Sequence, residues 1–155
     1  MCHDPDTNAL LLACKGYPGK NYKNYRAIYS FSLTTKKLTE EPRFLLPIDK
    51  IIKKDKYDFV RKLGEFFFLP TENTFAPSGI ETNPSTGTFF IIAARGNAII
   101  EISSEGEIIG KALLKREIHN QPEGITLTPD LSLIIADEGG SKRATLTKYP
   151  LLEEE

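Results

Sequence analysis

Three carboxylates in the C-terminal third of the chain have the chemistry of a metal site. Glu123 follows the stretch His-Asn-Gln-Pro, and Asp137 and Glu138 close an apolar run. Carboxylate oxygens are the hard ligands that Ca²⁺ takes, and the same groups are candidates to hold a catalytic metal. The alternative is that Glu123 caps neighbouring backbone N–H groups or pairs with a basic residue.

A wider set of polar residues is suited to a small ligand. It combines cationic, hydroxyl, amide and imidazole groups, which favours an ion, a small anion or a polar molecule. The set is Lys15, Ser78, Arg95, Asn97, His119, Gln121 and Glu123. His119 is either a ligand or acid–base group, or a hydrogen-bonding loop residue. Arg95 has the alternative of bridging neighbouring elements. No spacing matches a nucleotide-binding loop or a Ser-His-Asp arrangement.

A repeat in the sequence positions these residues. Residues 1–16, 77–97 and 122–140 share an apolar residue, a proline four positions later, a polar turn and an apolar run. The aligned pairs are Met1 with Pro5, Ile80 with Pro84, and Ile125 with Pro129. The match slips by one or two residues after the turn, as hairpin turns of different length would make it. A spacing of 45 residues between the last two copies, with several short strands in each, predicts β-propeller blades.

A second repeated segment completes the predicted blade. Residues 27–38 and 98–109 both show the alternation of a hairpin. We therefore expect an all-β fold, a partial propeller of about three blades of four-stranded antiparallel sheet, with strands A to D in each blade. Hairpin turns are predicted at residues 5–8, 84–88 and 129–132. Continuously buried strands are predicted at residues 10–12, 89–92 and 133–135, because such apolar runs fit sheets covered on both faces.

The repeat also predicts how the single domain of residues 1–155 is divided. Blade one covers about residues 1–46, an insertion 47–72, blade two 73–116 and blade three 117–152. Within the insertion, Asp49 is a possible N-cap of a short helix. Ile52, Tyr57, Val60 and Leu63 would form the apolar stripe of that helix.

Blade topology predicts that the polar residues meet at one end of a central channel lined by strand A. D–A connections and B–C loops lie at that end, whereas A–B and C–D turns lie at the other. The D–A connection of blade three therefore brings His119 and Glu123 towards Asp137 and Glu138. Blade two adds Ser78, Arg95 and Asn97, and blade one adds Lys15.

The overall composition restricts the possible partners. The net charge is −1, from 20 basic and 21 acidic residues, which gives no electrostatic reason to expect nucleic acid or an anionic membrane. No apolar run is long enough to cross a bilayer.

The two cysteines are too far apart for a disulfide. A hairpin that pairs Cys2 with Leu11 places Cys14 roughly 10 Å from Cys2, and a disulfide needs Cα atoms within about 7 Å. We therefore expect two free, mostly buried thiols.

Three segments together carry a family resemblance. They are CHDPDTNALLLACKG, FAPSGIETNPSTGTFFIIAARGNAIIEISSEGEIIG and QPEGITLTPDLSLIIADEGG. As a set they resemble the SdiA-regulated, YjiK/CarP-like family of bacterial propellers, which is similar to NHL and regucalcin-like propellers. The resemblance implies six blades, no settled activity, and an exported protein that is periplasmic or otherwise associated with the cell envelope, often membrane-associated. In the family a Glu-Gly pair usually precedes the first motif, and here it would lie before Met1.

Two functions remain open from the sequence. One is a non-catalytic binding or scaffold module that holds an ion, such as Ca²⁺, or a polar ligand at the channel end, or a partner on its rim. The alternative is a metal-dependent hydrolase like the lactonase or phosphatase propellers. Ser78 occupies in blade two the position that Glu123 has in blade three, which weakens a metal ring and favours binding.

The incomplete first and third blades predict a partner for the chain. Three blades cannot close a ring, so we expect the C-terminal half of a longer protein. An N-terminal half or a second copy would then be its partner. The isolated chain is expected to be marginally stable and self-associating, because its terminal blades would expose apolar faces.

Overall fold

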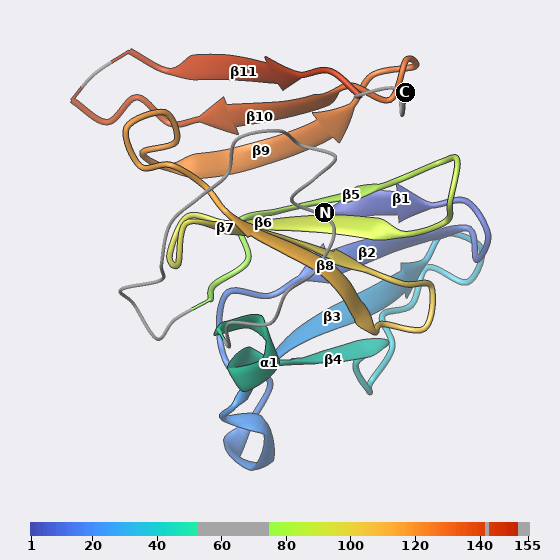
Figure 1. The fold of residues 1–155 in the computed structure, drawn as a ribbon. Coiled ribbons are helices and arrows are strands. Elements are labelled where there is room, and N and C mark those ends of the chain that lie inside the picture. The colour runs from blue at the N-terminus through green and yellow to red at the C-terminus, as the bar shows by residue number, and fades with distance from the viewer. Residues whose placement is uncertain (53–74, 142, 152–155) are drawn as a thin grey trace.

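Three antiparallel sheets follow one another along the chain (Figure 1). The computed structural model describes residues 1–52, 75–141 and 143–151. Sheet I contains β1 (Cys2–Asp4), β2 (Ala9–Ala13), β3 (Tyr25–Ser32) and β4 (Phe44–Pro47). Sheet II contains β5 (Gly79–Thr82), β6 (Phe89–Ala93), β7 (Ala98–Ile102) and β8 (Ile108–Leu113). Sheet III contains β9 (Pro122–Leu127), β10 (Leu133–Asp137) and β11 (Thr145–Tyr149). The fold is all-β, and the three consecutive sheets form a partial β-propeller, as predicted.

Strand β5 joins the three sheets. It packs against β1 and β2 of sheet I and against β9 of sheet III. Ser78, just before β5, donates its hydroxyl proton to the carbonyl oxygen of Pro122 at 2.5 Å. At the other end of β5, Thr82 donates to the carbonyl oxygen of His3 at 2.6 Å. Sheet II is therefore anchored to sheet III at one end of β5 and to sheet I at the other.

The turns between the first two strands of each sheet lie where the repeat predicted them. The residue before the proline stabilises each turn: Asp4 accepts the N–H of Asp6 at 3.2 Å, and Asn83 accepts the N–H of Ser85 at 3.1 Å. In the third turn, Thr128 donates to the carbonyl oxygen of Ser132 at 3.0 Å. Short polar side chains that bond the backbone two to four residues away favour turns over strands. The recurrent Pro motif therefore marks a hairpin turn in each sheet.

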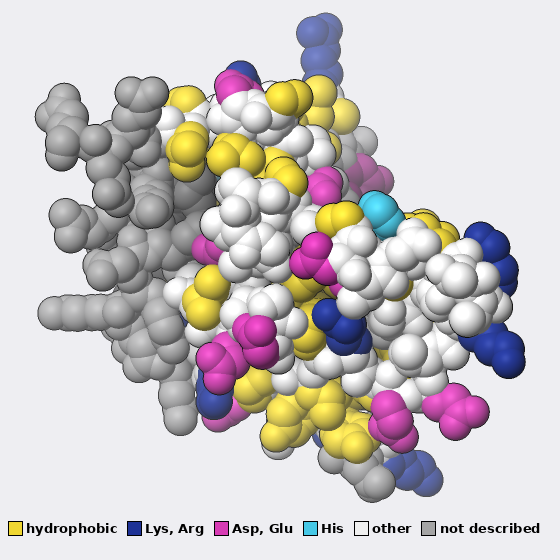
Figure 2. Space-filling view, turned by 90° about the vertical axis from the view of Figure 1, so that its right-hand side faces the viewer, with side chains coloured by type: hydrophobic (Ala, Val, Ile, Leu, Met, Phe, Trp, Pro, Cys, Tyr) yellow, Lys and Arg dark blue, Asp and Glu magenta, His cyan; other side chains and the backbone are white. Residues whose placement is uncertain are grey.

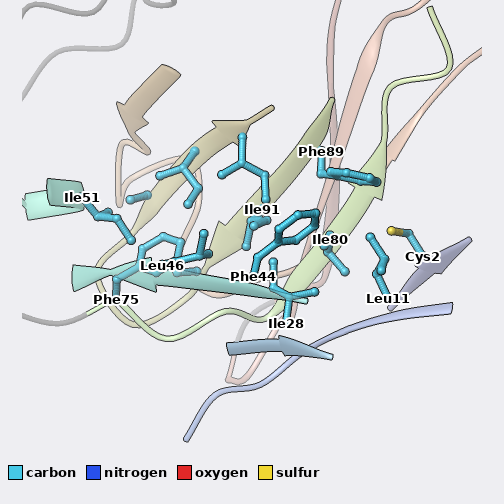
Figure 3. Close-up of a cluster of buried hydrophobic side chains, with 14 residues drawn as sticks. Cys2, Leu11, Ile28, Phe44, Leu46, Ile51, Phe75, Ile80, Phe89 and Ile91 are labelled. Carbon is cyan, nitrogen blue, oxygen red and sulfur yellow. The ribbon is translucent and has the colours of Figure 1, made fainter. Parts of the chain in front are cut away.

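Strand β6 separates two hydrophobic cores. Successive side chains of a strand point to opposite faces. Phe89 and Ile91 therefore contribute to the core shared with sheet I, and Phe90 and Ile92 to the core shared with sheet III. Figure 3 shows the first core, in which the rings of Phe44 and Phe89 lie 5.8 Å apart. All five residues of β6 are buried, which confirms the predicted continuous burial of residues 89–92.

The equivalent runs in sheets I and III are buried at alternate positions. Leu11 in β2, and Leu133 and Ile135 in β10, face sheet II and are buried. The residues between them are only half-buried, namely Leu10, Leu12 and Ile134. Among the described residues, each flanking sheet has a neighbouring sheet on one face. Continuous burial was therefore the wrong prediction for these two strands.

Two further expectations can be compared with the structure. Helix α1 (Ile48–Ile52) begins one residue before Asp49, so Asp49 lies in the first turn, where its charge still favours the helix N-terminus. The remainder of the predicted helix lies outside the described residues. In sheet I, the 27–38 hairpin closes on a single bridge between Phe31 and Leu38. The fourth strand comes later, at β4.

Both cysteines are free, as predicted. Cys2 is paired with Leu11 in the β1–β2 register and is buried, whereas Cys14 is half-buried. Burial raises the pKa of the Cys2 thiol, while a hydrogen bond with Thr82 acts in the opposite direction. Cys2 therefore acts as an apolar side chain of the core between sheets I and II.

Candidate functional site

Lys15 and Glu123 meet across the end of the sheets. Lys15 follows β2 of sheet I, Glu123 belongs to β9 of sheet III, and their Nζ and Oε2 atoms are 3.3 Å apart. The two side chains are 63% and 36% exposed. Two residues 108 positions apart in the chain are thus brought together, and the expected pairing of Glu123 with a basic residue is observed. The exposure of both groups leaves them open to solvent and to a ligand.

Two further predicted residues, Ser78 and Asn97, bond to the backbone. The hydroxyl of Ser78 donates to Pro122 and accepts the N–H of Ala94 at 3.1 Å. The buried amide of Asn97 donates to the carbonyl oxygens of Leu114 and His119, both at 2.9 Å. Asn97 has a φ of 46°, a conformation that Asn adopts more readily than most residues. These two residues shape the end of sheet II and hold the connection to sheet III.

His119 is the centre of a buried polar network. Its Nδ1 lies 2.7 Å from Oδ2 of Asp137, and its Nε2 lies 2.6 Å from the hydroxyl of Tyr149. His119 is fully buried and Asp137 is 5% exposed. Since a carboxylate accepts, Nδ1–H donates to Asp137, and in the neutral ring Nε2 accepts the hydroxyl proton of Tyr149. The pKa of Tyr149 is raised, first by burial and then by the negative charge of Asp137. The network ties β11 to β10 and to the connection before β9.

The remaining predicted residues lie around this network. Glu138 is exposed, and its backbone N–H donates to the carbonyl oxygen of Gln121 at 2.9 Å. Arg95 is also exposed, and its carbonyl oxygen accepts the N–H of Ala76 at 3.1 Å. Glu138 and Arg95 thus present their side chains to solvent, while their backbone atoms close the connections between strands.

The three carboxylates predicted to hold a metal have different surroundings. Glu123 is paired with Lys15, Asp137 bonds His119, and Glu138 faces solvent. Within residues 1–52, 75–141 and 143–151, no group of three or more His, Cys, Asp or Glu side chains is arranged to hold a metal ion. One oxygen of Asp137, Oδ1, is buried without a hydrogen-bond partner in this part of the chain. Calcium binding stays a prediction.

A family model now accounts for the repeat. The SdiA-regulated model matches residues 71–152, which is more than half of the chain. The chain belongs to the SdiA-regulated family. The match covers sheets II and III, and the same Pro turn and strand register extend the pattern into sheet I. The SdiA-regulated pattern therefore includes the residues that form the buried network, from His119 to Tyr149.

Two solved structures are similar to this SdiA-regulated chain. Hydrazine synthase of Kuenenia stuttgartiensis aligns with a TM-score of 0.45 and 13% identity, over 96% of this chain and 36% of that one. A streptogramin B lyase structure aligns with a TM-score of 0.42 and 16% identity, over 97% of this chain and 57% of that one. The chain thus spans about a third and somewhat more than half of their lengths. No curated protein matched its sequence.

Sequence reasoning did not single out Tyr149. The residue lies at the end of β11, and its ring packs against the second core. No signal in the sequence of the strand indicated this, because its other apolar residue, Leu146, is on the opposite face and is 76% exposed. The bond to His119 depends on the fold of the His119–Gln121 connection.

The two ends of the sheets differ in character. Figure 2 shows the end with the first turns of each sheet, where acidic, basic and hydrophobic side chains are interspersed. The opposite end contains the exposed Lys15–Glu123 pair and the buried His119–Asp137 contact. In the described residues, no helix has the length and apolar character needed to span a bilayer.

Proposed function

We propose that this chain is a non-catalytic binding or scaffold module of a β-propeller protein. Its ligand is an ion or a small polar molecule, bound at the end of the sheets where Lys15 and Glu123 meet. The observation that carries the proposal is this exposed ion pair, which joins sheet I to sheet III. An exposed pair contributes at most about 1 kcal/mol, so both charges are available to a ligand with complementary groups.

The surroundings of the pair support binding more than catalysis. The imidazole of His119 is fully buried and both of its nitrogens are engaged. A general acid or base must come within hydrogen-bond reach of the substrate, and this ring is occupied with Asp137 and Tyr149. In the proposal the network is a rigid structural support, since its members link β10, β11 and the connection before β9.

Three further expectations accompany the proposal. A partner, either further blades or a second copy, would cover the outer faces of sheets I and III. The whole protein is expected in the periplasm or elsewhere at the cell envelope, as the family resemblance implies. Ca²⁺ would bind through Glu123 with Asp137 or Glu138, and it competes with Lys15 for the carboxylate.

Calorimetric titration with calcium chloride, sodium acetate and glycine tests the ligand site. We expect one probe to bind saturably, and Lys15→Ala or Glu123→Ala to weaken its Kd roughly tenfold, as for loss of one charged contact. Lys148→Ala is the matched control, because Lys148 also forms an exposed ion pair at 3.3 Å, with Asp130, elsewhere in sheet III. Binding that weakens equally in the control, or no binding of any probe, would contradict the proposal.

A further inference from the structure

The loop between β2 and β3 lies in a stretch of the chain that has basic and no acidic residues. Between Asp6 and Glu40 the sequence has six basic residues, Lys15, Lys20, Lys23, Arg26, Lys36 and Lys37. The first three lie in the loop, together with Tyr17 and Tyr22. Figure 1 shows this loop projecting beyond sheet I near α1. A concentration of one sign of charge raises the local concentration of the opposite ion.

Arg26, which follows the loop in β3, is buried without a carboxylate. The residue is 6% exposed. Its Nη1 donates to the carbonyl oxygen of Tyr25 at 3.2 Å, and its Nε has no hydrogen-bond partner. In the part of the chain that the structure describes, Arg26 forms no ion pair. A buried guanidinium with an unused donor is unfavourable, because buried charges are normally paired and hydrogen-bonded.

A second arginine of the same sheet, Arg43, can be compared with Arg26. The guanidinium of Arg43 stacks on the ring of Phe44 at 5.0 Å, and that of Arg26 stacks on the ring of Tyr17 at 4.8 Å. Arg43 also lies 3.7 Å from Oδ2 of Asp4. Each arginine therefore stacks on an aromatic ring of its own. Among the described residues, only Arg43 has a carboxylate partner, although Arg26 is the more buried of the two.

We propose that Arg26 anchors a binding site for an oxyanion, the carboxylate or phosphate group of a small ligand. Oxyanions bind in the plane of a guanidinium, where the free Nε points, while an aromatic ring occupies one face. Tyr17 is 64% exposed although its ring covers Arg26, so it separates the charge from solvent. The lysines of the loop supply the attraction that brings the anion to the site.

The loop has the backbone freedom that ligand access requires. Tyr17 and Pro18 lie between Gly16 and Gly19, and Gly19 has a φ of 139°, which side-chain-bearing residues rarely adopt. A Cβ atom at either glycine would meet no atom within 4 Å. The glycines are therefore not required by close packing, and they allow Tyr17 to move aside and close again over the anion.

This site has the loop residue Lys15 in common with the ligand position proposed above, but its anchor is a different residue. Arg26 lies on the third strand of sheet I, whereas Glu123 lies on the first strand of sheet III. Glu123→Ala is expected to leave anion binding at Arg26 intact. Failure of one proposal is thus distinguishable from failure of the other.

An NMR titration that follows the arginine Nε–Hε signals tests the proposal directly. Sodium phosphate and sodium acetate are added to the ¹⁵N-labelled chain, with sodium chloride at matched ionic strength as reference. The Arg26 signal, assigned by its loss in Arg26→Lys, should shift saturably with phosphate or acetate and not with chloride. Whichever of phosphate and acetate binds more tightly identifies the class of anion. Arg26→Lys should weaken the Kd, measured by calorimetry, roughly tenfold or more.

Two further variants complete the experiment. Arg43→Lys is the matched control and should leave the Kd unchanged, because Arg43 already has Asp4. Tyr17→Ala replaces an exposed ring, so the fold should tolerate it, and the affinity should fall several-fold because the anion contact becomes exposed to water. An Arg26 signal that responds no more to phosphate and acetate than to chloride overturns the proposal, and so does an unchanged Kd in Tyr17→Ala.

Discussion

The second strands of sheets II and III have similar sequences and different environments. β6 reads FFIIA and is buried at every position, whereas β10 reads LIIAD and is buried at alternate positions. The difference arises from the neighbours: sheet II is covered on both faces, by sheets I and III, and sheet III has sheet II on one face. An apolar run alone therefore does not tell whether a strand is covered on one face or on two.

The largest expected effect comes from truncating one isoleucine in each of these two strands. Ile91 in β6 is fully buried, and Ile134 in β10 is half-buried on the outer face. Ile91→Ala should lower the free energy of unfolding by about 3 kcal/mol, and Ile134→Ala by about 1 kcal/mol, because only the first leaves a closed cavity. Urea unfolding of both variants measures the difference. Equal losses would show that the outer face of sheet III is covered in solution, for example by a second copy.

A smaller effect is expected where sheet III is held by polar contacts. Tyr149→Phe keeps the ring but leaves Nε2 of His119 without the hydroxyl, which should cost about 1 kcal/mol. Amide exchange in β11 should become faster, because this network attaches the strand to the rest of the sheet. Tyr29→Phe, a half-buried tyrosine of sheet I, is the control. A β11 exchange rate that does not change would show that backbone pairing alone holds the strand.

The smallest expected effect distinguishes two turns by their acid sensitivity. The pKa of Asp130 is held well below its usual range by hydrogen bonds from the hydroxyls of Thr128 and Ser132, and further by Lys148. Because the pKa is lower in the folded state, the stabilisation is fully present above the unfolded-state pKa of about 4 and is lost progressively as the pH falls from there towards the lower folded-state pKa. Asp130→Asn should therefore lose less stability than the wild type on acidification.

Urea midpoints at about pH 6 and pH 3 measure this acid sensitivity. Asp6→Asn, in the corresponding turn of sheet I, is the control, because the described residues place no hydroxyl against the Asp6 carboxylate. Identical acid sensitivity of Asp130→Asn and the wild type would rule out the turn as its source.

Much of the fold could be predicted from local patterns. The prolines at positions 5, 84 and 129 mark the three hairpins because the preceding Asp4, Asn83 and Thr128 stabilise the turns through contacts a few residues away. The register of Cys2 with Leu11, and the free thiols, followed from the same turn. By contrast, the later position of β4 could not be read from the 27–38 hairpin, because pairing of Phe31 with Leu38 ends after one bridge.

The proximity of several candidate site residues could be predicted, whereas their surroundings could not, and their role in binding stays a prediction. Chain topology alone indicated that the connection containing His119 and Glu123 lies near Asp137 and Lys15. Which groups are buried was set by packing: the ring of His119 is enclosed between Asp137 and Tyr149, while Glu123 remains at the surface beside Lys15. The self-association expected from the open sheet faces stays a prediction.

Apart from the position of β4, the sequence by itself determined the strands, their turns and the order of the three sheets, because these depend on alternation and on contacts within a few residues. The tertiary structure decided which apolar strand is covered on both faces and which carboxylate meets a histidine. It also decided that Arg43 has an anionic partner, whereas Arg26 forms no ion pair among the described residues and its Nε is without a hydrogen-bond partner there. Burial and charge pairing depend on groups that are distant in the chain, and their free energies change with the surroundings.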